Sequence, residues 1–335
     1  MTQPFKVLYI GPAAADKSQL PSIEQQTRAI QLAGGTVVRY EGKDTAQLAE
    51  ALRDVDVAML QGHGFDNSVF AQMGLHGRCK GLVSFGHGFD HLDLDIATRN
   101  GVIVANTASF GTEEVSNHTM MHFLVVSRKF VLHDKMVRSG VWKRTSLPPM
   151  GHVLGQVFGI VGLGDIGRAV ARKAKAFGLQ VIAYDPYVAS WDALEHGVEM
   201  VPTLEDLCRR SDYITVHIYL NAETRHLISR PQFAVMKPTA YLINCARGGV
   251  VDEAALIEAL KNRTILAAGL DVFHGEPRIN PAFLQLDNAT LLPHVGSASQ
   301  YTRNAMGQLV MDNLVAYAEG KPPKTPVPET PFKGW

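Results

Sequence analysis

Short apolar stretches alternate with amphipathic, helix-like segments along most of the chain. In the first hundred residues, apolar or β-branched stretches predict strands at 7–10, 36–40, 55–60 and 81–85. Helical spacing predicts helices at 22–33 and 45–53, and Gly34-Gly35 ends the first of them. Strands that alternate with helices are typical of a parallel sheet covered on both faces.

A second series of strands and helices follows a long amphipathic segment at 112–140. Thr112, Glu113 and Glu114 favour a helix start there, because acidic side chains suit the positive end of the helix dipole. The irregular stretch 142–152 then separates two units. The pattern next predicts strands at 157–161, 180–184, 213–217, 240–244, 266–270 and 290–292, and a last helix at 301–319. We expect the proline-rich tail to be extended and to lie on the surface.

Length and composition fit this pattern. A chain of 335 residues, 46% of them hydrophobic, is too long for one ordinary core and suits two domains. We therefore predict an α/β protein with two parallel sheets.

Charge and cysteine content exclude several classes of protein. Lys plus Arg equals Asp plus Glu at 32 each, without a basic cluster, so we expect no nucleic-acid partner. No apolar run is long enough to span a membrane, and the N-terminus lacks the pattern of a signal peptide. Cys79, Cys208 and Cys245 form no C-x-x-C pair, and their odd number argues against a disulfide framework. We expect a cytoplasmic protein.

One short repeat stands out. Gly62-His63-Gly64-Phe65-Asp66 recurs as Gly86-His87-Gly88-Phe89-Asp90, each time directly after a predicted strand. The carboxyl ends of parallel strands are where open α/β sheets bind ligands. Glycine-rich turns that merely end the strands are the alternative, and they remain as plausible for the first copy.

The segment Gly162-Leu163-Gly164-Asp165-Ile166-Gly167 has the spacing G-x-G-x-x-G between a predicted strand and a predicted helix. In this context the motif is typical of dinucleotide binding. Gly162 permits the tight turn, Gly164 lets a pyrophosphate approach the backbone, and Gly167 lets helix and strand pack closely. The helix N-terminus would attract the anion.

An acidic residue follows the next strand at the expected distance. Asp185 lies where such folds bind a ribose hydroxyl, and its carboxylate would repel a 2′-phosphate. Pro186, Tyr187 and Val188 add no basic side chain. The sequence therefore favours NAD over NADP as the cofactor.

Three polar residues follow the last three predicted strands, namely Arg247, Glu276 and His294. Arg247 can bind a substrate carboxylate with its planar guanidinium and polarise the neighbouring carbonyl. His294 can exchange a proton with the carbonyl oxygen, and Glu276 can fix its tautomer and favour imidazolium. Singly, each residue has an ordinary alternative as a capping arginine, a surface acid or a loop histidine. Their joint order behind a nucleotide-binding motif favours catalysis.

The chain resembles the D-isomer-specific 2-hydroxyacid dehydrogenases, a family that includes glyoxylate/hydroxypyruvate reductases, phosphoglycerate dehydrogenase and the C-terminal-binding-protein corepressors. The segments that carry this resemblance are Gly162–Gly167, Asn244–Asp252, Gly269–Phe273, Glu276-Pro277 and Pro293-His294. It implies an NAD-dependent enzyme that interconverts a 2-oxo acid and a D-2-hydroxy acid, with Arg247, Glu276 and His294 in the roles given above. A non-catalytic NAD(H)-sensing scaffold like the corepressors is the alternative.

The resemblance also implies further site residues. Cys245, Ala246, Asp271, Gly296 and Ser297 would approach the nicotinamide end of the cofactor, together with Arg247 and His294. Asp165 and Ile166 would contact it within the glycine motif, and Ile218 and Tyr219 would flank the adenosine. His87 matches a position near both cofactor and substrate. Substrate-binding groups would be Arg247 and the two repeated loops, through Gly62, His63, Gly86, His87 and Gly88.

By the same resemblance, a Rossmann-type cofactor domain (106–299) is inserted into a flavodoxin-like substrate domain (1–105 and 300–335). The helix predicted at 112–140 would support a homodimer through the cofactor domain. One departure concerns the usual His-x-Pro after the strand at 213–217, which is His217-Ile218-Tyr219 here and alters the expected adenine pocket.

His118 and His122 have the i, i+4 spacing of a helical metal site. Their neighbours Met120, Met121 and Phe123 favour a packed interface instead, so we expect no resident metal.

Overall fold

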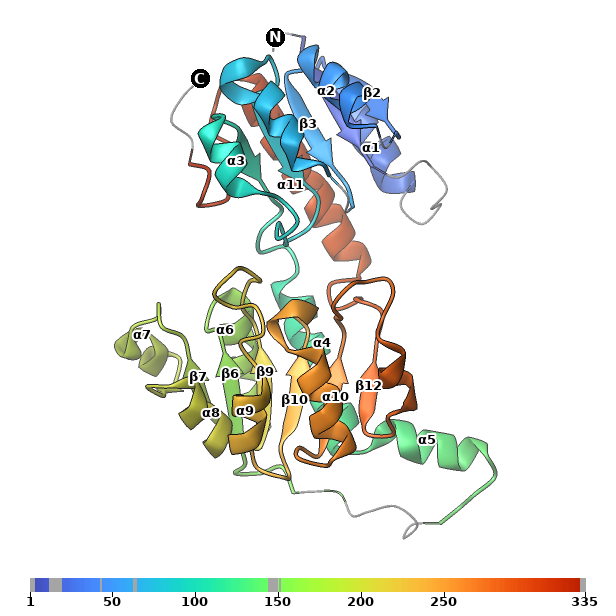
Figure 1. Cartoon of the computed structure of the whole chain (residues 1–335), viewed down its shortest axis with the longest axis vertical. Helices are drawn as coiled ribbons and strands as arrows, with labels where there is room; N and C mark the ends of the chain where they lie inside the picture. Colours follow the sequence, from blue (N-terminus) through green and yellow to red (C-terminus); the bar gives the residue numbers. More distant parts are fainter. Residues whose placement is uncertain are drawn as a thin grey trace. The chain divides into compact units, whose positions relative to one another are not determined.

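The computed structural model describes residues 4–11, 20–42, 44–62, 65–143, 150 and 152–331. The chain forms two compact units, Met1–Phe110 with Ser299–Trp335 (unit 1) and Gly111–Ala298 (unit 2) (Figure 1). The borders expected from the sequence were 105/106 and 299/300. Each unit is an α/β structure around one sheet, so the predicted fold class is confirmed.

Unit 1 contains a five-stranded sheet in the order β2-β1-β3-β4-β5, with every pair parallel. This is the flavodoxin-like order. Its strands are β1 (Lys6–Ile10), β2 (Thr36–Tyr40), β3 (Val57–Leu60), β4 (Gly81–Ser84) and β5 (Ile103–Ala105). Its described helices are α1 (Leu20–Leu32), α2 (Thr45–Arg53), η1 (Asn67–Gln72), η2 (Gly74–His76), α3 (Leu94–Arg99) and α11 (Gln300–Ala318).

Unit 2 contains a seven-stranded parallel sheet in the order β12-β11-β10-β9-β6-β7-β8. Its strands are β6 (Val157–Val161), β7 (Gln180–Tyr184), β8 (Glu199–Met200), β9 (Tyr213–Val216), β10 (Tyr241–Asn244), β11 (Ala267–Leu270) and β12 (Ala289–Leu291). Its described helices are α4 (Thr112–Ser127), α5 (Phe130–Arg138), α6 (Asp165–Ala176), α7 (Ser190–Glu195), α8 (Leu204–Arg210), α9 (Arg230–Val235), η3 (Gly248–Val250), α10 (Glu253–Lys261) and η4 (Pro281–Gln285). The chain order reverses at β6, which puts the ligand-binding switch point of the Rossmann order at the carboxyl end of this strand.

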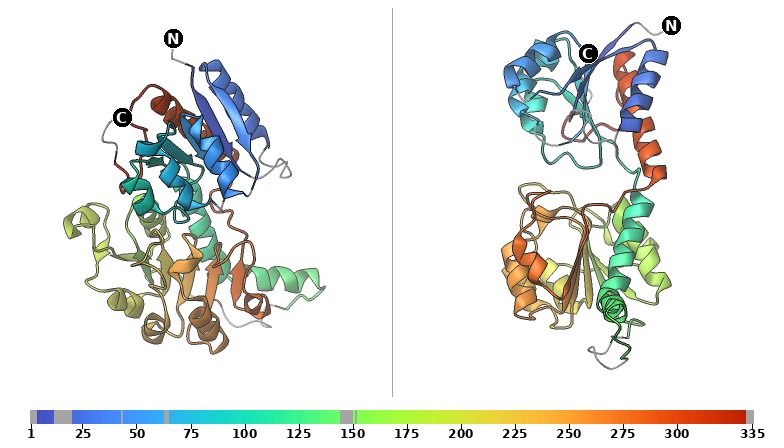
Figure 2. Two further views of the ribbon diagram at one scale, coloured as in Figure 1. Left: turned by 45° about the horizontal axis from the view of Figure 1, so that its top comes forward. Right: turned by 90° about the vertical axis from the view of Figure 1, so that its right-hand side faces the viewer.

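Helices cover both faces of each sheet, so each unit has two apolar cores (Figure 2). In unit 2, one core packs α4 and α6 against the sheet, and the other packs α8, α9 and α10 against the opposite face. Strands buried on both faces of a sheet are mostly apolar, which is why most of them were recognisable in the sequence.

Several elements differ from the prediction. The short strands β5 and β8 were not expected from the sequence. The segment 112–140 is not one helix, because Lys129 adopts the left-handed conformation at φ 52° and separates α4 from α5. The proline-rich tail is not wholly superficial. Val327 and Thr330 are buried, and the amide of Val327 donates to the carbonyl of Val104 in β5.

None of the helices within the described residues combines the length and the apolar character that a membrane crossing requires.

Candidate functional site

The glycine motif forms the turn between β6 and α6 in unit 2. Gly162 has φ +93°, and a Cβ there would lie 2.6 Å from the His217 carbonyl oxygen. A Cβ on Gly167 would lie 2.2 Å from the Gly162 carbonyl oxygen. Both positions therefore require glycine for the turn itself and for the close packing of α6 on β6.

Gly164 differs from both. It precedes α6 directly, has an ordinary negative φ of −76°, and is exposed. A Cβ on Gly164 would meet no heavy atom of the described chain within 4 Å. The packing of unit 2 does not explain a glycine here, whereas a phosphate resting on the backbone at the helix N-terminus does. The turn thus fits a dinucleotide.

Asp185 follows β7 and is tied to the same turn. One of its carboxylate oxygens accepts a hydrogen bond of 2.9 Å from the Leu163 amide, and the other accepts one of 2.9 Å from the Tyr187 amide. The sequence did not indicate this contact with Leu163. Each carboxylate oxygen has a second lone pair that can accept a hydrogen bond from a hydroxyl group.

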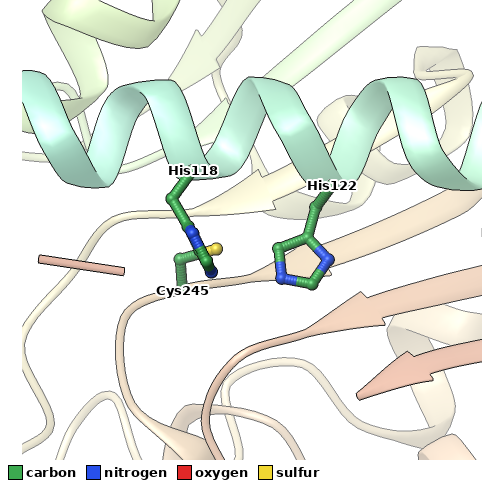
Figure 3. Close-up of side chains that lie close together, drawn as sticks. All are labelled: His118, His122 and Cys245. Carbon is green, nitrogen blue, oxygen red and sulfur yellow. The ribbon is translucent and has the colours of Figure 1, made fainter. Parts of the chain in front are cut away.

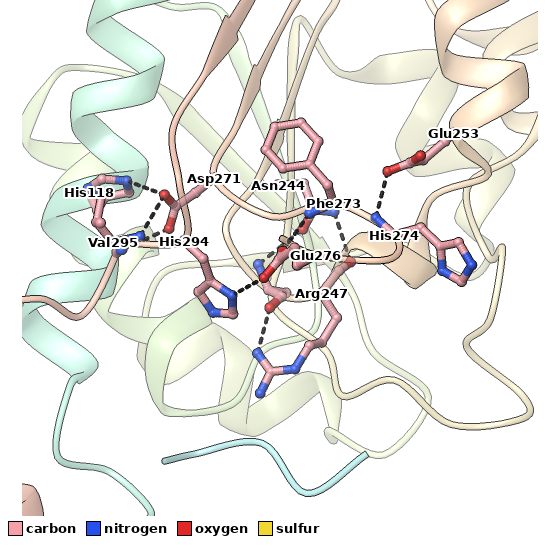
Figure 4. Close-up of polar contacts among 12 residues, drawn as sticks. His118, Asn244, Arg247, Glu253, Asp271, Phe273, His274, Glu276, His294 and Val295 are labelled. Atoms are coloured by element: carbon pink, nitrogen blue, oxygen red, sulfur yellow. Dashed lines mark hydrogen bonds and ion pairs between the residues drawn. The ribbon is translucent and has the colours of Figure 1, made fainter. Parts of the chain in front are cut away.

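Three loops bring the predicted catalytic residues together in unit 2 (Figure 4). His294 Nδ1 lies 2.7 Å from Glu276 Oε2, and the other oxygen of Glu276 accepts a 2.7 Å hydrogen bond from the Phe273 amide. His294 adopts the left-handed region at φ 56°, and its amide donates to the Asp271 carbonyl at 2.8 Å. Its side chain remains 44% exposed, so the ring can reach a ligand.

The electrostatics of Glu276 favour its charged form. Burial raises the pKa of this carboxyl, but the hydrogen bonds from His294 and Phe273 and the charges of His294 and Arg247 outweigh it. The net pKa of Glu276 lies below its usual value. Glu276 is therefore an ionised partner for the imidazole.

The turn that carries Arg247 packs against the loop that carries Glu276. A Cβ on Gly248 would lie 2.0 Å from the Phe273 carbonyl carbon, so this position must be glycine. Asn244 holds the turn, because its Nδ2 donates to the Arg247 carbonyl and its Oδ1 accepts from the Ala246 amide, both at 3.0 Å. Arg247 Nη1 donates to the Ala246 carbonyl at 2.7 Å.

Asp271 organises the loop after His294. Its side chain is 1% exposed, and its two oxygens accept hydrogen bonds from the Val295 amide at 2.9 Å and the Gly296 amide at 2.7 Å. His118 Nε2 on α4 lies 3.3 Å from Asp271 Oδ1 (Figure 4). Burial raises the pKa of Asp271, but these contacts outweigh it and leave the pKa below its usual value. This role of His118 has no signal in the sequence, because it depends on how α4 packs.

The remaining candidates of unit 2 lie around these loops. Ile218 is partly buried beside the glycine turn, and Tyr219 is exposed. Cys245 is buried, which raises the pKa of its thiol to about 12. Ala246 follows it in the Arg247 turn, and Ser297 follows the buried Gly296.

The candidate substrate residues Gly62, Gly86, His87 and Gly88 belong to unit 1. The amide of Gly86 donates to Thr107 Oγ1 at 2.9 Å, so it is already engaged within the unit. Asn106 Nδ2 donates to the His87 carbonyl at 2.8 Å. His63 lies outside the described residues.

Comparison with known proteins identifies the family of this chain. The family model for the NAD-binding domain of D-isomer-specific 2-hydroxyacid dehydrogenases matches residues 120–296. Glyoxylate reductase of Pyrococcus furiosus is 40% identical over 287 residues, which are 83% of this chain and 84% of that protein. D-3-phosphoglycerate dehydrogenase of Methanocaldococcus jannaschii is 36% identical over 288 residues, covering 86% of this chain and 54% of that protein.

Among solved structures, the NADPH-dependent glyoxylate/hydroxypyruvate reductase of Sinorhizobium meliloti, in complex with NADP and malonate, is similar with a TM-score of 0.83 and 33% identity. The match covers 97% of this chain and 98% of that one. The resemblance inferred from the sequence motifs is confirmed. With more than half of its residues matched by the family model and with relatives this similar over most of its length, the chain belongs to the D-isomer-specific 2-hydroxyacid dehydrogenases.

Proposed function

We propose that the protein reduces a small 2-oxo acid to a D-2-hydroxy acid with NADH. The observation that carries this proposal is the contact between His294 Nδ1 and the ionised Glu276, close enough to Arg247 for the guanidinium to lower the pKa of Glu276. A proton donor held by a carboxylate, beside a cation suited to a carboxylate substrate, is the arrangement that reduction of a 2-oxo acid needs.

Each residue of the cluster has a separate task in this proposal. Glu276 engages Nδ1 of His294, which leaves Nε2 to donate a proton to the substrate carbonyl oxygen. Arg247 binds the substrate carboxylate and polarises the carbonyl. Bound NADH would supply the hydride. The amide contacts of Asp271 hold the peptide that follows His294 and so fix where the imidazole stands.

NAD is the proposed cofactor, with Gly162, Gly164, Asp165, Ile166 and Gly167 at the pyrophosphate. Asp185 supports this choice over NADP, because a carboxylate beside the glycine turn repels a 2′-phosphate. The similar Sinorhizobium meliloti enzyme is NADPH-dependent, so the choice needs a direct test. We expect kcat/KM with NADH to exceed that with NADPH in the protein as it stands, and Asp185→Ser to reduce the difference. Equal efficiency with both cofactors in the unaltered protein would refute the role of Asp185.

For the substrate, we propose glyoxylate or hydroxypyruvate, which are named for several relatives. Unit 2 would be the cofactor-binding unit, with Ile218 and Tyr219 at the adenosine and Cys245, Ala246, Gly296 and Ser297 toward the nicotinamide. Unit 1 would be the substrate-binding unit through Gly62, His87 and Gly88. Because the Gly86 amide already donates to Thr107, we exclude it from the proposed carboxylate-binding groups.

The decisive experiment is NADH oxidation with a panel of 2-oxo acids, from glyoxylate to bulkier side chains. We expect turnover with the small members, and a large loss of kcat in His294→Ala with NADH affinity retained. Arg247→Ala should raise KM and also lower kcat. A matched control is His196→Gln, an exposed histidine of unit 2 outside the cluster, which should leave both constants unchanged. Intact NADH binding without turnover across the panel would favour an NADH-sensing scaffold instead.

We also propose a homodimer formed through α4 and α5. All nine residues of α5 are at least partly exposed, with Phe130 60% and Val137 49% exposed. Phe130 and Val137 are seven residues apart and so lie on one side of α5, and apolar side chains gathered on one exposed face are typical of a surface covered in an assembly. Light scattering should give twice the chain mass, and Phe130→Asp should shift it toward the monomer. A monomeric unaltered protein at micromolar concentration would refute the dimer.

A cytoplasmic location is proposed from the three free, buried cysteines.

A further inference from the structure

Three side chains with nitrogen and sulfur donors lie close together in unit 2 (Figure 3). They are His118 and His122 on α4 and Cys245 directly after β10. One ligand atom from each lies within 4.8 Å of the other two. None of the three has the acid–base role that we propose for His294.

His122 is the feature that packing alone does not explain. Its side chain is 0% exposed, and neither of its ring nitrogens has a hydrogen-bond partner among the described residues. Leaving a buried polar group unpaired costs about 1–3 kcal/mol. An apolar residue would fill the same place on α4 without that cost.

The residues around His122 leave space for its imidazole ring. Gly269 of β11 lies beneath it, and a Cβ there would stand 2.8 Å from His122 Nδ1. The ring of His118 lies edge-on to that of His122, with the two centroids 5.0 Å apart. In Figure 3, both imidazoles extend from α4 toward the side where the Cys245 sulfur lies.

His118 also has the second partner that a metal-bound imidazole generally has. Its Nε2 lies 3.3 Å from the Asp271 carboxylate, and metal-binding histidines usually donate their other N–H to such a group. That contact would fix the ring and leave Nδ1 for a cation.

We propose that His118, His122 and Cys245 form a binding site for a zinc ion. Two imidazoles and a thiolate are a donor set that zinc prefers, and i, i+4 histidines on one helix are a common way to supply two of its ligands. Zn–N bonds of about 2.0 Å and a Zn–S bond of about 2.3 Å place tetrahedral ligands roughly 3.5 Å apart. The three atoms must therefore close by about 1 Å, which rotation of the imidazole rings can provide. On binding, the Cys245 thiol loses its proton to solvent and the thiolate becomes the ligand.

The three side chains connect α4 with the loops that carry Arg247 and His294. Cys245 precedes the Arg247 turn, and His118 contacts the carboxylate that holds the two amides after His294. A bound zinc ion would join α4 to both loops.

The test is a titration of the whole protein, freed of metal by a chelator, with zinc in competition with a chelating dye. We expect one zinc ion per chain in the unaltered protein. His122→Leu removes one ligand but suits a buried helical position, and it should weaken zinc binding by at least about 100-fold, the upper end of the loss seen when even an outer contact of a metal site is removed. His196→Gln is the control, since this exposed histidine near Asp192 is itself a plausible surface site for adventitious zinc. It should bind zinc as the unaltered protein does.

Cobalt provides a second measurement that does not depend on any variant folding. Cobalt added to the metal-free protein should show the strong visible bands of a tetrahedral site and a near-ultraviolet charge-transfer band from the Cys245 thiolate. Absence of that charge-transfer band would overturn the proposal. Equal zinc affinity in folded His122→Leu and the unaltered protein, or a loss of binding in His196→Gln alone, would also overturn it. In either case His122 is a packed, neutral imidazole.

Discussion

Replacing Asp271 by asparagine tests how much the protein depends on one buried carboxylate. In the structure, its two oxygens accept from the Val295 and Gly296 amides at 2.9 and 2.7 Å, and His118 Nε2 lies 3.3 Å away. Asparagine has nearly the same shape but only one acceptor oxygen. Its NH2 group must therefore face one of the two backbone N–H groups, which leaves that donor unpaired in a buried place.

The cost can be worked out from these contacts. A hydrogen bond to a charged acceptor contributes about 1.5–3 kcal/mol and a neutral one about 0.5–1.5 kcal/mol, so the retained bond loses about 1 kcal/mol. The backbone amide left without an acceptor lowers the stability by a further 1–3 kcal/mol, and we take about 2 kcal/mol. We therefore expect Asp271→Asn to lower the stability of unit 2 by about 3 kcal/mol. For a domain of this size, that corresponds to a fall in Tm of roughly 6–12 °C.

Differential scanning calorimetry at neutral pH measures this change. Asp287→Asn is the matched control, because Asp287 makes an exposed ion pair with Arg263 and should lose at most about 1 kcal/mol. Activity supplies a second reading, since the same amides position His294, and we expect kcat to fall more than NADH affinity. The reasoning is refuted if the Tm values of Asp271→Asn and Asp287→Asn differ by less than about 2 °C, which corresponds to a difference in stability of at most about 1 kcal/mol.

Three other predictions follow from single contacts. Gly164→Ala should change the stability by no more than about 0.5 kcal/mol but weaken NADH binding roughly tenfold. Gly167→Ala should instead lower the stability by about 1–3 kcal/mol, because its Cβ would lie 2.2 Å from the Gly162 carbonyl oxygen. Calorimetry and NADH fluorescence titration measure the two effects, and equal effects of both variants would contradict the assignment. Tyr317→Phe should destabilise unit 1 by about 1–3 kcal/mol, since its hydroxyl donates to the Ile103 carbonyl at 2.9 Å, while Tyr301→Phe at an exposed site should not. The pKa of Glu276 is lowered in the folded protein, so its ionised form stabilises the fold fully above the unfolded pKa of about 4.3, and this stabilisation is lost as the pH falls through the lower folded pKa. The difference in Tm between the unaltered protein and Glu276→Gln should therefore shrink below about pH 4. A difference that stays constant with pH would exclude this linkage.

Much of the fold could be predicted because its determinants are local. The inner strands of both sheets are buried on two faces and are therefore mostly apolar, as at Val157–Val161, whereas the edge strand β2 is largely exposed. Asp252 precedes α10, and its side chain accepts from the Ala255 amide at the start of this helix. The order of Arg247, Glu276 and His294 on successive strand ends was visible in the sequence, because parallel strands deliver their carboxyl ends to one edge of the sheet.

Features that depend on tertiary packing were missed. The segment 112–140 keeps a helical pattern throughout, yet Lys129 in the left-handed conformation divides it, and no glycine or proline marks that position. Val327 is a single apolar residue among prolines, and only its contact with the sheet of unit 1 shows that it belongs to the core. The contact of His118 with Asp271 joins residues far apart in the sequence and leaves no local signal.

The three glycines of the dinucleotide motif show how structure divides what sequence treats as one signal. Gly162 and Gly167 are each required by atoms of the protein itself, since a Cβ at either would collide with a backbone oxygen. Those two glycines would be needed in any turn of this shape, whether or not a ligand bound to it. Gly164 has no such constraint among the described residues, so the motif points to a cofactor chiefly through this position. His122 is comparable, because its buried ring nitrogens have no hydrogen-bond partner among the described residues, and this observation supports the proposed zinc site.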